Sequence, residues 1–454
     1  MAFKKDFAWG VATSSYQIEG AAYDDGKGLS IWDMYCKQPG KVYGGHTGDV
    51  ACDHYYRYKE DVKIMKDMGT KAYRFSISWP RVMPDGIGKI NEKGLQFYSD
   101  LVDELIDSGI EPYVTLFHWD LPYELYKKGG WMNSESPSWF AEYAAVITER
   151  LSDRVKYFIT FNEPQCFIGL SHIDSVHAPG LKQSVPDTLK MAHNVLLAHG
   201  MAVKAIRKHA KVDVKVGYAP TASMHYPATE SKEDIEAARR AVMEMPKDLE
   251  QNWAWNITWW SDPVFFGKYP EDGVKLFGDF MPEIKDGDME IISQPLDFLG
   301  HNIYNGIEVK AGENGEIEFI KRYPGFPKTG LSWPVTPKAL YWGTKFLYER
   351  YKMPIYITEN GLSCHDVVSL DGKVHDPNRI DFLHRYLAEL KRAAKDGVDI
   401  GGYFQWSFLD NFEWHSGYDE RFGLVFVDYE TQKRTIKDSG YWYKEVMESN
   451  GENL

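Results

Sequence analysis

The chain has 454 residues, and its 43% hydrophobic and 26% charged residues are typical of a globular protein. Its net charge of −14, with no basic tract, argues against nucleic acid and anionic membranes as partners. No apolar run reaches the roughly 20 residues that a membrane-spanning helix needs. The four cysteines, Cys36, Cys52, Cys166 and Cys364, lack CxxC spacing, so we expect reduced thiols and a cytoplasmic location.

Eight short runs of strand character recur along the chain. They are residues 7–17, 72–79, 112–119, 157–164, 216–221, 298–304, 355–361 and 403–408. Between them lie amphipathic patterns such as 94–110 and 379–398, each with a glycine near its end, as helices with C-caps have. Eight alternating units predict a parallel, closed (β/α)8 barrel. No linker divides the chain, so we expect one domain over residues 1–454 with a frayed tail at 450–454.

Two insertions follow predicted strands and should form extended loops around the barrel mouth. Residues 305–335 contain Asn314-Gly315 between alternating segments, which predicts a β-hairpin. Residues 362–380 form a polar loop with Asp371-Gly372. In a barrel, loops after strands shape the entrance to the site.

The predicted strands end in polar or aromatic side chains. These are Gln17, Arg74, His118, Trp119, Asn162, Glu163, Asn302, Tyr304, Glu359, Asn360 and Trp406, while the fifth strand offers only Thr221 and His225. Pro164 should end the fourth strand and hold Glu163 in an extended conformation, because proline disfavours the helical region for the preceding residue. Since active residues of such barrels lie at the carboxyl ends of strands, we expect these side chains to meet.

Glu163 and Glu359 occupy matching positions, each beside an asparagine at a strand end. A lone glutamate there could form a salt bridge or a helix cap. Two facing carboxyls instead suit glycoside cleavage, in which one is a protonated acid and the other attacks or activates water.

The motifs around these residues resemble glycoside hydrolase family 1, and the resemblance runs from end to end. It rests on YQIEGA (16–21), YRFSISWPR (73–81), FHWDLP (117–122), TFNEP (160–164), HAPG (177–180), Asn-X-Tyr (302–304), ITENG (357–361) and WSFLDNFEW (406–414). The resemblance implies a (β/α)8 barrel and a β-glucosidase that retains configuration, without a cofactor. It also implies that Glu163 is the acid/base and Glu359 the nucleophile, with Arg74 and Tyr304 as its partners.

Repulsion between two close carboxylates should raise one pKa, and donors at Glu359 would leave the proton on Glu163. By resemblance, the residues that contact sugar are Gln17, His118, Trp119, Asn162, Asn302, Tyr304, Trp406, Glu413, Trp414 and Phe422, with Trp333 at the mouth. His177 and Gln165 are expected nearby. His118 precedes Asp120 by two residues, but metal-ligand spacings such as HExxH are absent, so no metal is expected.

Several alternatives remain beside hydrolysis of β-glucosides and cello-oligosaccharides. The same site could act on β-galactosides or β-fucosides, because Gln17 and Glu413 can bind an equatorial or an axial hydroxyl. By resemblance, Glu413 argues against 6-phosphorylated sugars, and Glu163 argues against thioglucosides. A sugar-binding pseudoenzyme would need loss of a glutamate, and a phosphate-binding barrel would need a Gly-rich loop after strands seven and eight. The aglycone preference and the choice between monomer and homo-oligomer stay open.

Overall fold

The computed structural model describes residues 3–249 and 252–454. Its centre is a closed barrel of eight parallel strands in the order β1-β11-β10-β7-β5-β4-β3-β2. The barrel strands are β1 (Ala8–Ala12), β2 (Ala72–Ser76), β3 (Glu111–Phe117), β4 (Tyr157–Asn162), β5 (Lys215–Ala219), β7 (Phe298–Asn302), β10 (Ile355–Asn360) and β11 (Ile400–Trp406). All eight predicted strands are therefore present, and the (β/α)8 barrel is confirmed.

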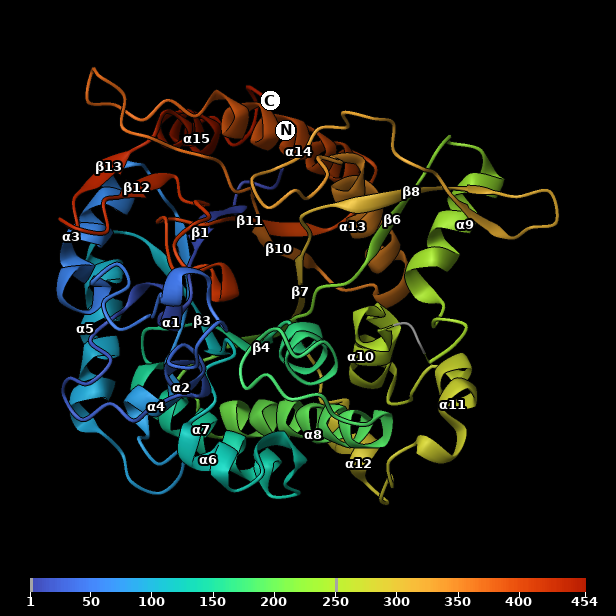
Figure 1. Ribbon diagram of the computed structural model, residues 1–454, viewed down its shortest axis with the longest axis horizontal. Coiled ribbons are helices and arrows are strands. Elements are labelled where there is room, and N and C mark those ends of the chain that lie inside the picture. The colour runs from blue at the N-terminus through green and yellow to red at the C-terminus, as the bar shows by residue number, and fades with distance from the viewer. Residues whose placement is uncertain (1–2, 250–251) are drawn as a thin grey trace.

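Helices surround the barrel, and Figure 1 shows α7 and α8 along one side and α13 to α15 along another. The α-helices are α1 (Ser15–Ile18), α2 (Ile31–Tyr35), α3 (His54–Asp67), α4 (Trp79–Val82), α5 (Glu92–Asp107), α6 (Tyr123–Lys127), α7 (Ser136–Leu151), α8 (Val185–His209), α9 (Lys232–Met243), α10 (Ile257–Phe266), α11 (Glu271–Phe277), α12 (Asp288–Ile292), α13 (Lys338–Tyr351), α14 (Pro377–Lys395) and α15 (Asp438–Glu448). The shorter turns are η1 (Tyr43–Gly45), η2 (Gly130–Met132), η4 (Trp253–Trp255), η5 (Gly278–Phe280) and η6 (Trp414–Ser416), and η3 (Gln165–Ile173) is a π-helix.

The helix predicted over 94–110 is α5, and its buried side chains show why it forms. Leu95, Tyr98, Leu101, Val102 and Leu105 recur at three- and four-residue steps and face the barrel core. The helix predicted over 379–398 is α14. Within the described residues, no helix combines enough length and apolar character to cross a membrane.

The insertion at 305–335 contains the predicted hairpin. Strand β8 (Gly306–Ala311) pairs antiparallel with β9 (Ile317–Phe319), and Gly315 between them has a φ of 78°. Strand β8 also pairs in parallel with β6 (Met224–Pro227), which belongs to the loop after β5. A separate antiparallel pair, β12 (Val425–Val427) and β13 (Arg434–Ile436), follows the loop after β11.

Two chain segments differ from the sequence-based expectation. The first strand ends at Ala12 rather than at residue 17, and Gln17 lies in helix α1, because the polar run Thr13-Ser14-Ser15 breaks the apolar pattern and serine favours helix starts. The tail expected to fray at 450–454 is instead bound. The Lys391 ammonium donates to the carbonyls of Gly451 and Leu454, at 2.8 and 3.0 Å.

Candidate active site

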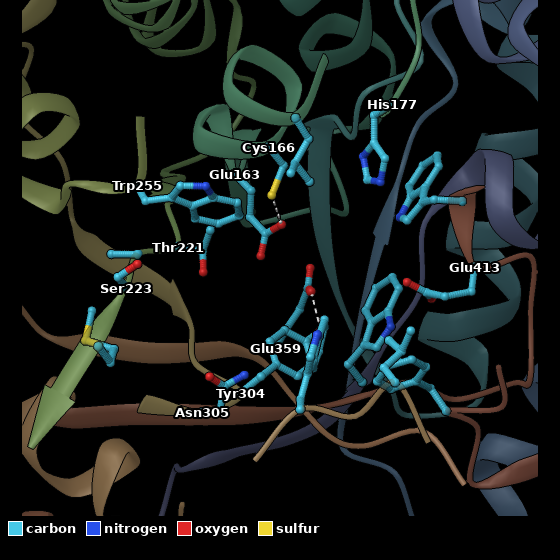
Figure 2. Close-up of a pocket in the computed structure, with 18 of the residues that line it drawn as sticks. Glu163, Cys166, His177, Thr221, Ser223, Trp255, Tyr304, Asn305, Glu359 and Glu413 are labelled. Carbon is cyan, nitrogen blue, oxygen red and sulfur yellow. Dashed lines mark hydrogen bonds between the residues drawn. The ribbon is translucent and has the colours of Figure 1, made fainter. Parts of the chain in front are cut away.

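A cavity of about 570 Å³ opens at the carboxyl ends of the barrel strands. Figure 2 shows side chains from several strands and loops pointing into it, with Glu163 and Glu359 facing the same space. Predicted site residues on its wall are His118, Trp119, Glu163, His177, Thr221, Tyr304, Trp333, Glu359, Trp406, Glu413, Trp414 and Phe422. The barrel therefore brings together residues that lie far apart in the chain, from His118 to Phe422.

Glu163 follows the end of β4 and connects it to the π-helix η3. Its φ is 45°, so the residue is left-handed rather than extended as predicted. Pro164 begins a helical turn in which the Cys166 amide donates to the Glu163 carbonyl at 2.9 Å. The chain must turn sharply from strand to helix, and this strained conformation is of a kind that concentrates at functional sites.

The carboxyl of Glu163 accepts hydrogen bonds from two uncharged donors. The Asn302 Nδ2 donates to Oε1 at 2.7 Å, and the Cys166 thiol donates to Oε2 at 3.1 Å. Burial, reinforced by the negative charge of Glu359, raises the pKa of Glu163 to about 8. Near neutral pH this carboxyl therefore holds a proton.

Glu359, near the end of β10, has stronger donors. The Arg74 guanidinium lies 2.7 Å from Oε1, and the Tyr304 hydroxyl donates to Oε2 at 2.7 Å. Burial raises the pKa of Glu359, while Arg74 and Tyr304 oppose that rise because both stabilise the ionised form. Of the two glutamates, Glu359 is thus the one that the surrounding donors favour as a carboxylate.

A hydrogen-bond network behind the cavity wall orients these groups. Asn162 Oδ1 accepts from Arg74 at 2.5 Å and from Asn302 at 3.0 Å, and Asn302 Oδ1 accepts from the Thr358 hydroxyl at 2.6 Å. The Asn162 amide also contacts Nε2 of His118 at 3.1 Å. One network therefore joins strands β2, β3, β4, β7 and β10 to both glutamates.

Gln17, Asn162 and Asn302 were predicted to contact the sugar, but none of them lines the cavity. All three are fully buried, and protein groups engage their polar atoms. The Gln17 Nε2, for example, donates to the Phe412 carbonyl at 2.8 Å and faces Glu413 Oε2 at 3.4 Å. Gln17 and Asn302 donate hydrogen bonds to carboxyls of the cavity wall, Gln17 to Glu413 and Asn302 to Glu163.

Aromatic rings form much of the cavity wall. The rings of His118 and Trp406 are nearly parallel, with centroids 5.7 Å apart, and Trp119 lies 4.5 Å from Trp414. The ring of Trp333 lies edge-on to that of Tyr304, with centroids 5.3 Å apart. Such faces suit the apolar side of a pyranose. The peptide bond between Trp406 and Ser407 is cis.

Glu413 supplies a third carboxyl to the cavity. Burial, together with the charges of Glu359, Glu420 and Glu163, raises its pKa to about 8. Figure 2 shows Glu413 on the opposite side of the cavity from Trp255. The Arg74 guanidinium is in contact with Glu359, so it neutralises only one of the three carboxyls.

Several residues of the wall were not predicted from the sequence. Cys166, Ser223, Trp255 and Asn305 line the cavity, but they lie beyond the strand ends, Cys166 in the π-helix η3 and the others on loops and a short turn. A search of strand ends alone does not find them. Gln165, expected near the cavity, is fully buried instead, and its side-chain oxygen accepts from the Thr221 amide at 3.3 Å.

The described residues place no group of three or more His, Cys, Asp or Glu side chains where it could hold a metal ion. His118, the residue considered as part of a metal fragment, is buried beside Arg74, and both effects lower its pKa well below the usual value. Its neutral ring contacts Asn162 through Nε2, and Nδ1 has no partner among the described residues.

Comparisons with known proteins agree with this geometry. The profile of "Glycosyl hydrolase family 1" matches residues 1–452. A 1,4-beta-D-glucan glucohydrolase of Thermotoga neapolitana is 47% identical over 99% of both chains, and Beta-glucosidase A of Thermotoga maritima is 47% identical over 99% of this chain and 98% of its own. The solved structure of a family 1 β-glucosidase from Thermotoga maritima, in complex with isofagomine lactam, has a TM-score of 0.89 and 46% identity over 99% of both chains. The chain belongs to glycosyl hydrolase family 1.

Proposed function

We propose that the chain is a retaining β-glucosidase in which Glu359 is the nucleophile and Glu163 the acid/base. It hydrolyses terminal, non-reducing β-D-glucosyl residues. The observation that carries the assignment is the asymmetry of the two carboxyls. A cation and a phenol donate to Glu359, whereas an amide and a thiol donate to Glu163, whose pKa is raised to about 8.

In the first step Glu359 attacks the anomeric carbon while Glu163 gives its proton to the glycosidic oxygen. The bond to that oxygen breaks, the aglycone leaves as an alcohol, and the sugar is held as an ester of Glu359. Esterification removes the negative charge of Glu359, which is one cause of the raised pKa of Glu163.

In the second step Glu163 is ionised, because loss of the Glu359 charge lowers its pKa. It takes a proton from water, and the water oxygen attacks the anomeric carbon. The ester bond breaks, Glu359 returns as a carboxylate, and Glu163 is protonated again. Two inversions at the same carbon give retention. One carboxyl thus serves both steps because its charge environment changes between them.

The cavity supports unphosphorylated sugars as substrates. None of the described residues on its wall is Lys or Arg, and Glu413 adds a carboxyl there. A phosphate dianion would enter without a counter-charge. The carboxyl of Glu413 can bind a sugar hydroxyl in either of two orientations, so β-galactosides and β-fucosides are expected as secondary substrates.

The opposite side of the cavity supports binding of the aglycone. Trp255, Ser223 and Asn305 lie there, away from Glu413 (Figure 2). Trp333 also lines the cavity. An aromatic face with nearby polar groups suits a second glucose unit, as in cellobiose and longer cello-oligosaccharides, or an aryl group. We further propose a cytoplasmic location, which the four free cysteines support.

The experiment that tests this function compares rates on nitrophenyl β-glucoside, β-galactoside, β-fucoside and cellobiose, and follows the first-formed product by proton NMR. We expect the β-glucoside and cellobiose to be cleaved and the β-anomer of glucose to appear first. An α-anomer formed first would exclude the retaining mechanism. A higher kcat/KM on the galactoside would favour the second candidate, a β-galactosidase using the same two glutamates.

A further inference from the structure

Cys166 lies next to the acid/base residue. It is the second residue of η3, it is only 4% exposed, and it lines the cavity. Figure 2 shows its sulfur pointing at the carboxyl of Glu163, with Sγ 3.1 Å from Oε2. The family's acid and base chemistry needs only the two glutamates, so this thiol has no role in the mechanism above.

The backbone fixes the thiol in this position. The amide of Cys166 donates to the carbonyl of Glu163 at 2.9 Å, so the two residues belong to one tight turn. The sulfur must also be the donor in the side-chain contact. Burial, and then the charge of Glu163, raise the pKa of the thiol well above its usual value, so the proton stays on sulfur.

A donor at Glu163 acts differently on its two protonation states. The ionised carboxylate accepts hydrogen bonds at both oxygens, from Asn302 and from Cys166. Bonds of this kind stabilise the charged form and lower the pKa. They therefore act against burial and the charge of Glu359, which favour the protonated form.

We propose that Cys166 is a positioning residue whose S–H donates to the ionised carboxyl of Glu163 and thereby sets how readily this group releases and recovers its proton. The inference rests on the proposed acid/base role of Glu163. The thiol keeps its own proton throughout, and the catalytic proton moves only between Glu163 and the leaving oxygen or water. The alkaline limit of activity then depends on a thiol outside the catalytic pair.

The test compares Cys166→Ala and Cys166→Ser by the pH dependence of kcat/KM on an aryl β-glucoside. The alkaline limb of this profile reports the pKa of the acid in the free enzyme. Loss of the donor in Cys166→Ala should move the limb upward by about 0.5 to 1 pH unit, because a hydrogen bond to a charged group is worth up to about two such units and a thiol is a weak donor. In Cys166→Ser a stronger donor is present, and the limb should stay at or below that of the parent.

Cys52→Ala is the matched control. Cys52 is also fully buried, and its thiol donates at 3.0 Å, but to the carbonyl of Asp410 outside the cavity. Its loss should change thermal stability without moving the alkaline limb. If Cys166→Ala does not fold, the comparison of Cys166→Ser with the parent protein still tests the proposal. An alkaline limb that moves upward in Cys166→Ser would contradict a donor role for the Cys166 thiol.

The opposing outcomes are distinct. If the alkaline limb lies at the same pH in the parent, Cys166→Ala and Cys166→Ser, the thiol only fills space. If the limb moves upward equally in both variants, the cause is a change in packing and not the loss of a donor. A parent protein without activity on any β-glycoside would instead refute the proposed function, whatever the cysteine variants do.

Discussion

Two clusters of charged side chains, one at the site and one outside it, are balanced differently. The site cluster consists of the buried residues Arg74, Glu163 and Glu359 and the partly exposed Glu413. The ion cluster, where the loops after β10 and β11 meet α14 and α15, consists of Asp366, Asp376, Arg379, Asp410, Arg421 and Lys437. The first sets three carboxyls against one cation, and the second sets three carboxyls against three cations.

In the ion cluster, each carboxyl contacts cations directly. The Lys437 ammonium lies 2.5 Å from Asp366 and 2.6 Å from Asp410, and Arg379 lies 2.7 Å from Asp366. Arg379 also pairs with Asp376. Burial alone would raise the pKa of Asp366, but Lys437 and Arg379 hold it below its usual value. Asp366 therefore stays ionised, and these ion pairs hold the loops together.

In the site cluster, the pKa values of all three carboxyls are raised, with burial as the largest cause for each. Only Glu359 contacts the guanidinium. Burial acts on the carboxyls of both clusters, since it is the largest cause that raises the pKa of Glu163 and it also acts to raise that of Asp366. The difference between the clusters therefore lies in the number of counter-charges. A deficit of cations leaves a proton available near neutral pH, which acid catalysis requires and a structural cluster avoids.

Glu359→Ala gives the largest expected effect, because it removes the one carboxyl that the site cluster keeps ionised. We expect turnover of nitrophenyl β-glucoside to fall by on the order of 10⁴- to 10⁶-fold, the scale seen when a covalent nucleophile is removed. Steady-state kinetics with freshly purified protein measures this. Substantial residual turnover would refute the nucleophile assignment, and an unchanged unfolding temperature would exclude misfolding as the cause.

Glu163→Ala removes the carboxyl that holds the proton. Cellobiose hydrolysis should fall by about 10²- to 10⁴-fold, the usual contribution of general acid catalysis, whereas a dinitrophenyl glucoside, whose leaving group needs no proton, should lose far less in its first step. Azide should restore the rate on the activated substrate and form the β-glucosyl azide. An α-azide product would mean that the two glutamates have exchanged roles.

Lys437→Met tests the balanced cluster. It leaves Asp366 and Asp410 without a shared cation, so we expect a loss of about 3 to 5 kcal/mol in the free energy of unfolding. Lys444→Met, in helix α15, which begins directly after Lys437, removes a partly exposed lysine and should cost less than about 0.5 kcal/mol. Denaturant unfolding measures both. Equal stabilities would show that the ion cluster is not what holds these loops.

Sequence patterns predicted the barrel and both glutamates, because strand periodicity is local and strand ends converge in this fold. They placed Asn302 at the end of its strand, as β7 has it, but not its neighbours behind the cavity wall or the place of Gln17 in helix α1. A side chain's neighbours across the barrel are not encoded in its own segment. The φ of Glu163 was also missed. The preference of residues before proline is statistical, and the turn into η3 overrides it.

The ion cluster was missed for the same physical reason as these contacts. Asp366 and Lys437 belong to segments that carry no shared motif, and only packing of the two loops against α14 and α15 makes them partners. Cys166 could have been found, since it stands three residues after Glu163 at the start of a helix. That spacing places it on the same turn as the catalytic carboxyl.

Tyr304→Phe gives the smallest of these effects and sharpens the comparison within the site. It removes the phenol that donates to Glu359 at 2.7 Å and leaves Arg74 in place. A hydrogen bond to a charged group contributes about 1.5 to 3 kcal/mol, so kcat/KM should fall by about 10- to 100-fold. Because the ionised form loses a donor, the pKa of Glu359 should rise, and the acid limb of the pH profile should move upward. An unchanged acid limb with the same rate loss would mean that Tyr304 acts on the sugar rather than on Glu359.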